Sequence, residues 1–266
     1  MCGIAGFFGS RYEYGEEILK KMTFALSHRG PDNNALWIDK NNLIGIGHTR
    51  LSIIDLTSTG NQPMFSKNDR YVIVYNGEIY NHLEIKSKIE QQSQKKSSYY
   101  WNGNSDTEIL LESISTFGIL ETLKSIRGMF AFALWDCLKK ELYLARDRMG
   151  EKPLYYGWIE NSFVFASELK SIKQHPKFQN EICRNSLSLY VRYNYIPNPW
   201  SIYKNIFKLQ PGYFLKINTS SADNSPIFEN QYPKTKDQFI LSSYWDMKSA
   251  ILASKENIIT DKSEAK

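Results

Sequence analysis

Short apolar runs, rich in β-branched and aromatic residues, recur along most of the chain. Runs of this kind, separated by turn-like residues, predict β-strands. One run ends in Asn76-Gly77, the dipeptide most typical of a tight hairpin turn. Strands are therefore expected at 2–8, 43–54 and 71–75, in the segments GMFAFALWD, ELYLARDR, PLYYGWI and SFVFAS, and as a last pair near 202–217.

Other segments carry apolar residues at helical spacing. Within 16–26 these residues fall on one face of a predicted helix. The segment from Ser105 to Glu108 is a capping box, which marks the beginning of a helix. The apolar face of the first helix consists of Ile18, Leu19, Met22 and Leu26, and further helices are predicted at 82–91, 119–125, 167–174 and 185–194, with a polar loop over 91–105.

The order of these elements indicates the fold class. Grouped hairpins with helices between them favour an α+β fold with antiparallel sheets. Past about residue 218 the composition changes to the loop-like SSADNSP and a weakly amphipathic, polar tail. We therefore expect 1–217 to form the folded domain and 218–266 to be an insertion or linker.

Composition and charge exclude several classes of protein. Of the 266 residues, 42% are hydrophobic and 14% aromatic, so most of the chain can bury a core and is not disordered. The net charge of +5 is spread along the chain, which argues against a nucleic-acid partner. No apolar run approaches the roughly 20 residues of a membrane span, and the first residues lack the features of a signal peptide.

The cysteines indicate the compartment. Cys2, Cys137 and Cys183 are odd in number and widely spaced, which fits neither a disulfide framework nor a zinc site. A reducing cytoplasm is the simplest location for such a chain. We expect a cytoplasmic protein that binds no metal.

The second residue, Cys2, is a candidate nucleophile. Methionine aminopeptidase removes Met1 when the next residue is this small, and a free α-amine would then lie on the residue that carries the thiol. The pKa of such an amine is about 7.7–8.0 and that of the thiol about 8.5, so the amine can serve as general base for its own side chain. The alternative is a small buried hydrophobic residue that is second by chance.

Two further groups of residues fit the same chemistry. Asn76-Gly77 offers a side-chain amide and a backbone N–H, the two donors of an oxyanion hole, with a simple hairpin turn as the alternative. Arg50 can hold an α-carboxylate with its bidentate fork, and Asp106 can hold an α-ammonium. The alternatives are a solvated arginine and an acid that only stabilises a helix dipole. His28 and His48 could assist a cysteine, but the N-terminal amine already offers a base.

The motifs together resemble the glutaminase domain of asparagine synthetase, a class II glutamine amidotransferase of the N-terminal-nucleophile hydrolase superfamily. The resemblance covers roughly residues 2–217 in the right order. It rests on MCGIAGFFG, SHRGPD, HTRLSIIDL, GNQPM, YNGEIYN, SDTE, RGMFAFALWD, ARDRMGEKPLYYG, FASELKSI and the KLQPG segment.

The resemblance implies both a fold and a site. The fold would be an αββα sandwich of two antiparallel β-sheets between helix layers. Cys2 would attack the side-chain amide of L-glutamine and release ammonia, leaving a γ-glutamyl thioester that water hydrolyses without a metal or organic cofactor. The implied site consists of the nucleophile Cys2, the oxyanion hole Asn76 and Gly77, the clamp Arg50 and Asp106 with Glu78 beside it, and the pocket backbone of Leu51, Ser52, Ile53 and Ile54.

The chain departs from this family in its length. Asparagine synthetases continue into a domain that uses ATP and Mg²⁺ to adenylate aspartate, with a pyrophosphate loop S-G-G-x-D-S that this sequence does not contain. We expect ammonia to be supplied to a synthetase domain or subunit in trans, or to one lost by truncation or gene splitting. The alternative is a non-catalytic domain that binds glutamine or a synthetase subunit as a regulator, for which a retained Met1 would be the sign.

Overall fold

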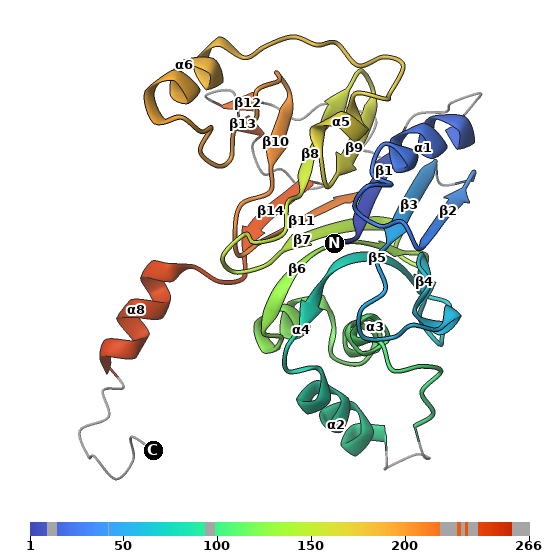
Figure 1. Cartoon of the computed structure of the whole chain (residues 1–266). Helices are drawn as coiled ribbons and strands as arrows, with labels where there is room; N and C mark the ends of the chain where they lie inside the picture. The colour runs from blue at the N-terminus through green and yellow to red at the C-terminus, as the bar shows by residue number, and fades with distance from the viewer. Residues whose placement is uncertain are drawn as a thin grey trace.

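The protein is a four-layered sandwich in which two β-sheets lie between layers of helices (Figure 1). The computed structural model describes residues 1–9, 15–41, 43–93, 99–218, 228–229, 232–233 and 239–256. Each of the two large sheets has six strands, and their neighbouring strands run antiparallel. The predicted α+β class and the αββα arrangement are both confirmed.

One sheet has the N-terminal strand β1 in its interior. Its strand order is β10-β8-β9-β1-β3-β2. β1 pairs with β3 on one side and with β9 on the other. The position of Cys2, the residue just before β1, is therefore fixed by the sheet. The strands of this sheet are β1 (Gly3–Phe8), β2 (Asn33–Asp39), β3 (Ile44–Arg50), β8 (Tyr155–Ile159), β9 (Ser162–Ala166) and β10 (Ile206–Lys208).

The second sheet carries the Asn76-Gly77 strand. Its order is β14-β11-β7-β6-β5-β4, and β5 is its longest strand together with β6. A separate two-stranded sheet joins β12 (Phe228–Glu229) and β13 (Tyr232–Pro233). The strands of the second sheet are β4 (Met64–Phe65), β5 (Tyr71–Ile79), β6 (Gly128–Asp136), β7 (Glu141–Arg146), β11 (Tyr213–Asn218) and β14 (Phe239–Ser243).

The predicted hairpins form, but each of the two sheets contains only one of them. β6 pairs with β7 and β8 pairs with β9, as the pattern predicted. The loop at 149–152 between the two hairpins passes from one sheet to the other. The predicted last pair also divides, since β10 pairs with β8 whereas β11 pairs with β7. A run of β-branched and aromatic residues marks a strand in the sequence, but it does not tell which strand lies beside it.

Helices cover the outer face of each sheet (Figure 1). α1 (Gly15–Phe24) and α5 (Leu169–Ile172) contact the β1 sheet, and α3 (Asp106–Phe117) contacts β5 and packs against α2 (His82–Ser93) and α4 (Ile119–Ser125). None of the described helices is long and apolar enough to cross a membrane. The other helices among the described residues are the 3-10 helix η1 (Ser58–Gly60), α6 (Arg184–Tyr193) and α8 (Met247–Glu256).

Alternate residues of the strands fill separate cores. On β5, Val72 and Val74 enter the core between the two sheets, whereas Ile73 and Tyr75 enter the core beneath α2, α3 and α4. A third core lies under α1 and α5 and takes Leu19 and other residues of the predicted helical face. Both faces of each sheet are therefore buried, which explains why the strands are apolar at most positions.

Asn76-Gly77 does not form a turn, and the turn prediction is wrong. β5 continues through both residues, which pair with Ala131 and Phe130 of β6. Neither residue has the positive φ that a type I′ turn needs. A Cβ on Gly77 would lie 2.4 Å from the carbonyl oxygen of Met129. Glycine is required at position 77 because β5 and β6 approach closely there. β5 continues through these residues because β6 still pairs with it.

Two predicted boundaries also shift. β3 ends at Arg50, so the apolar residues at 51–54 belong to a loop rather than to the expected strand 43–54. At the other end, β14 adds a strand to β11 and buries Phe239 in the core between the sheets. Residues 239–243 are thus part of the folded domain, although they lie in the expected insertion or linker 218–266. Much of 219–238 and all of 257–266 lie outside the described residues.

A buried histidine makes the stability of this fold depend on pH. His48 is inaccessible to solvent, its Nε2 donates to the backbone oxygen of Tyr75 at 3.1 Å, and burial lowers its pKa to about 4. An unfolded chain binds the proton near pH 6.5, so the free energy of unfolding should fall as the pH drops from 6.5 towards 4. The contribution of His48 to this loss is about 1.4 kcal/mol per pH unit at most.

Urea unfolding at several pH values tests this dependence. His48→Gln can keep the hydrogen bond to Tyr75 without taking up a proton, so its stability should change less between pH 6.5 and 4. The exposed His28→Gln serves as the control and should follow the unmodified protein. Equal pH dependence in all three proteins would contradict the assignment.

Candidate active site

The Cys2 thiol lies against the backbone of the loop that follows β3. Its Sγ is 3.4 Å from the amide nitrogen of Leu51 and 3.6 Å from the carbonyl oxygen of the same residue. Burial raises the pKa of the Cys2 thiol, and the hydrogen bond to Leu51 and the nearby positive charges oppose the shift. A thiol in this setting needs a base to become a nucleophile at neutral pH.

Arg29 holds the N-terminus in place. Its Nε donates to the carbonyl oxygen of Cys2 at 2.9 Å, and its Nη1 pairs with Glu168 at 2.7 Å. The α-amine of Met1 is next to these groups, and burial, followed by the charges of Arg29 and Lys152, lowers its pKa. Removal of Met1 would place the α-amine on Cys2 instead, the residue whose carbonyl oxygen Arg29 binds. Arg29 lies in the motif SHRGPD, but its contact with the N-terminus was not predicted from the sequence.

Asn76 presents a free donor beside the cysteine. The residue is 1% exposed, and its Nδ2 has no hydrogen-bond partner among the described residues. A buried amide without a hydrogen-bond partner is costly. An unpaired donor at this point therefore indicates that a ligand accepts its hydrogen bond. Gly77 follows it on β5, and the absence of a side chain there keeps the backbone close to β6.

Asp106 begins α3 and is held by the phenol of a buried tyrosine. Its Oδ2 accepts from Tyr75 Oη at 2.7 Å and from the amide of Ile79 at 2.9 Å. Burial raises its pKa, which these two donors oppose. Both contacts use the same oxygen, so Oδ1 is left without a hydrogen bond among the described residues and can accept from an ammonium group.

The residues around Asp106 confirm the predicted helix start with one difference. Ser105 is the N-cap, and its hydroxyl accepts from the amide of Glu108 at 3.2 Å. In a capping box, the Glu108 carboxylate would accept from the backbone N–H of the N-cap residue Ser105, but here it binds residues further back in the chain. It accepts from the amides of Asn102 and Gly103, each at 2.9 Å. The chain before α3 is therefore fixed by the helix itself.

Arg50 is partly occupied by its own loop. Its Nη1 donates to the carbonyl oxygen of Thr57 and to Asn61 Oδ1, each at 2.7 Å, and its Nη2 donates to the carbonyl oxygen of Asp55. A guanidinium has five N–H donors, so two of them, one on Nη2 and one on Nε, are left for a ligand. The predicted carboxylate contact would have to use this side of the fork.

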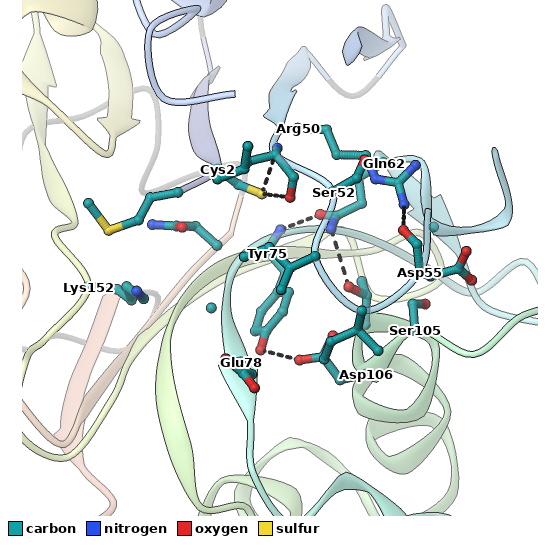
Figure 2. A pocket seen from close by; sticks show the side chains of 18 of the residues that line it. Cys2, Arg50, Ser52, Asp55, Gln62, Tyr75, Glu78, Ser105, Asp106 and Lys152 are labelled. Carbon is teal, nitrogen blue, oxygen red and sulfur yellow. Dashed lines mark hydrogen bonds between the residues drawn. The ribbon is translucent and has the colours of Figure 1, made fainter. Parts of the chain in front are cut away.

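All the predicted site residues line one pocket (Figure 2). The structure brings together residues that are far apart in the sequence: Cys2 just before β1, Arg50 at the end of β3 with the loop after it, residues of β5, and Asp106 at the start of α3. The predicted residues in its wall are Cys2, Arg50, Leu51, Ser52, Ile53, Ile54, Asn76, Gly77, Glu78 and Asp106. Their roles toward a substrate stay predictions, but their common location is a property of the fold.

The pocket also contains residues that the sequence reasoning missed. Tyr75 and Gln62 are buried beside it, with Gln62 Oε1 accepting from the Tyr75 amide at 2.6 Å. Asp55 and Lys152 are also part of the wall. All four residues lie in the motifs HTRLSIIDL, GNQPM, YNGEIYN and ARDRMGEKPLYYG, and these motifs were the one signal in the sequence that could have found them.

Neither candidate histidine lies in this wall. His48 lies on β3, and its hydrogen bond to Tyr75 joins the two sheets. His28 is exposed and contacts Glu168 and Lys170. No cluster of His, Cys, Asp and Glu that could hold a metal ion occurs in the described part of the chain.

Comparison with known proteins identifies the family. Residues 1–231 match the family described as glutamine amidotransferase domain. The chain belongs to this family.

The curated relatives include asparagine synthetases. The chain is 40% identical over 229 residues to a putative glutamine-hydrolysing asparagine synthetase 2 of Methanocaldococcus jannaschii, covering 79% of this chain and 42% of that protein. It is 37% identical to asparagine synthetase 1 of Bacillus subtilis, covering 80% of this chain and 33% of that protein. The chain therefore spans less than half the length of these relatives.

Solved structures share the fold at low sequence identity. The glutamine phosphoribosylpyrophosphate amidotransferase of B. subtilis, complexed with ADP and GMP, superimposes with a TM-score of 0.60 at 19% identity. The match covers 92% of this chain and 49% of that chain. At this identity the similarity supports the two-sheet architecture alone.

The two charged residues of the predicted clamp can be tested separately. We expect Arg50→Ala to raise KM for glutamine about tenfold or more, because a charge-assisted contact is worth about 1.5–3 kcal/mol. The variant should also have a lower melting temperature, since it leaves three loop acceptors without a donor. Asp106→Asn should raise KM as well. Unlike Arg50→Ala, this variant leaves no protein partner unpaired at Tyr75, because the amide oxygen can still accept from its hydroxyl. Unchanged glutamine affinity in both variants would refute the clamp.

Proposed function

We propose that this chain hydrolyses L-glutamine to glutamate and ammonia through a thioester on Cys2. The observation that carries the proposal is the position of the Cys2 thiol in the same pocket as an unpaired buried amide of Asn76. A nucleophile beside an empty donor fits acyl transfer, in which an oxyanion forms next to the attacking atom. Membership of the glutamine amidotransferase family supports glutamine as the substrate.

The first half of the reaction forms the thioester. The α-amine, on Cys2 once Met1 has been removed, accepts the thiol proton, and the sulfur attacks the side-chain amide carbon of glutamine. The oxyanion is stabilised by Asn76 Nδ2 and the N–H of Gly77. When the tetrahedral intermediate collapses, the amine returns the proton to the departing nitrogen and ammonia leaves.

The second half restores the enzyme. The same amine takes a proton from water, and the resulting hydroxide attacks the thioester carbon. The oxyanion hole is used again, the carbon–sulfur bond breaks, and glutamate and the Cys2 thiol are regenerated. Arg50 and Asp106 hold the α-carboxylate and α-ammonium throughout, and the reaction needs no cofactor from this chain.

The destination of the ammonia is proposed from the relatives. Several of them are named asparagine synthetase, and the chain covers less than half of their length. We therefore propose that the ammonia amidates aspartate in an ATP- and Mg²⁺-dependent synthetase domain or subunit. The chain would act in the cytoplasm, where these substrates are present. The alternative, a non-catalytic regulatory domain, is not favoured, since the complete set of predicted catalytic groups lines one pocket.

Loss of the nucleophile should abolish the activity. We expect Cys2→Ala to release no glutamate above background, and a chloroketone analogue of L-glutamine to modify Cys2 alone. Mass spectrometry of the modified protein and a glutamate assay measure both effects. Cys137→Ala and Cys183→Ala are the matched controls and should remain fully active. Modification of Cys137 or Cys183, with activity retained in Cys2→Ala, would refute the mechanism.

Hydrolysis should not depend on ATP. The sequence contains no S-G-G-x-D-S loop, and the proposed glutaminase groups all precede residue 107. Pure chain incubated with glutamine, aspartate, ATP and Mg²⁺ should form glutamate, but no AMP, pyrophosphate or asparagine. Formation of asparagine by the pure chain would contradict this division of labour.

A further inference from the structure

The loop between β3 and η1 forms one wall of the pocket, and apolar burial does not hold it. Its apolar side chains point to solvent, with exposed fractions of 65% for Ile53 and 76% for Leu56. The loop nevertheless contains residues 51–54 of the predicted glutamine site and provides the contact for the Cys2 thiol. Polar contacts must therefore fix its position.

One carboxylate makes four of these polar contacts. Asp55 is 7% exposed, and its Oδ1 accepts from the amide of Thr57 at 2.8 Å and from the hydroxyl of that residue at 2.6 Å. Its Oδ2 accepts from Thr59 Oγ1 at 2.9 Å and from the amide of Asn104 at 3.1 Å. The hydroxyl of Thr57 and the backbone amides hold the pKa of Asp55 well below its usual range, so the carboxylate stays charged.

The contact with Asn104 connects the loop to the beginning of α3. The amides of residues 102, 103 and 104 all donate to carboxylates, the first two to Glu108 and the third to Asp55. Gly103 is close to Asp55, because a Cβ there would lie 2.8 Å from Oδ2. Asp106 follows two residues after Asn104.

The backbone of Asp55 contacts Arg50, the residue predicted to bind the α-carboxylate of glutamine. Arg50 Nη2 donates to the carbonyl oxygen of Asp55, and Arg50 Nη1 donates to that of Thr57. Asp55 thus contacts Arg50 through its main chain and the segment before Asp106 through its side chain. An α-amino acid needs a cation and an anion at a fixed separation, and this residue connects the two.

We propose that Asp55 is a positioning residue that sets the affinity for glutamine by holding the loop 51–60 between Arg50 and the amides before α3. The proposal rests on the proposed glutaminase function. Asp55 acts on the ends of the substrate through Arg50 and Asp106, whereas the reacting groups lie just before β1 and on β5. Its loss should therefore change binding far more than chemistry.

Asp55→Asn is the sharpest test. The variant keeps the volume and the Oδ1 acceptor, but its amide group faces the N–H of Asn104, so two donors meet. We expect KM for glutamine to rise about fivefold or more while kcat changes less than about twofold. Alkylation of Cys2 by iodoacetamide, which needs no clamp, should keep its rate, and alkylation by the chloroketone analogue of glutamine should slow.

Matched variants keep the test decisive. Asp69→Asn removes an exposed carboxylate from a turn outside the pocket and should leave every measurement unchanged. Thr59→Val removes one donor to Asp55 and should give a smaller rise in KM, which serves if Asp55→Asn fails to fold. An unchanged KM, or an equal loss in kcat and in the iodoacetamide rate, would overturn the proposal.

A measurement without turnover separates this proposal from the proposed function. In a Cys2→Ala background, calorimetry should show weaker glutamine binding when Asp55 is replaced by Asn, and hydrogen exchange should be faster in residues 51–61. If the unmodified protein binds glutamine but does not hydrolyse it, the glutaminase proposal fails and the loop proposal is still decided by these results. Equal exchange and equal affinity would overturn the role of Asp55 alone.

Discussion

The hydrogen bonds of the buried residue Tyr75 fix the geometry of the pocket. Its carbonyl oxygen accepts from His48 on β3, its amide donates to Gln62, and its phenol donates to Asp106 on α3. One residue thus connects both sheets and the helix layer beside Asn76. An unpaired polar group at this depth is costly, so these contacts stabilise the junction of the two sheets and α3. The separation between the cysteine, the amide and the carboxylate follows from them.

The pocket wall differs in character from the rest of the fold. The sheets are stabilised by apolar residues on both faces, and their strands place Cys2 and Asn76 with little freedom. The loop after Arg50 turns its apolar side chains to solvent and depends on Asp55 and Arg50 instead. A rigid platform for the reacting groups is thus combined with a polar wall for recognition. Substitutions in the two parts should therefore differ in whether they change chemistry or affinity.

Several features of the site followed from the sequence because they depend on local order. The N-terminal position of Cys2, the capping residue Ser105 and the run of β-branched and aromatic residues that begins β5 are all visible in a few adjacent residues. The family motifs supplied the rest of the predicted set, and all of it lines one pocket. Tyr75, Gln62 and Asp55 were missed, since they act on other protein groups and have no local pattern of their own.

The sequence by itself determined the class of fold, most of the elements and the list of chemically active residues. The tertiary structure decided which strands lie side by side, because an apolar run carries no information about its partner strand. It also decided that Asn76-Gly77 continues a strand, since the close approach of β6 excludes a side chain at Gly77 and supplies the pairing that a turn would lack. The occupation of Arg50 by its own loop likewise appears only when residues 50, 55, 57 and 61 are brought together in space.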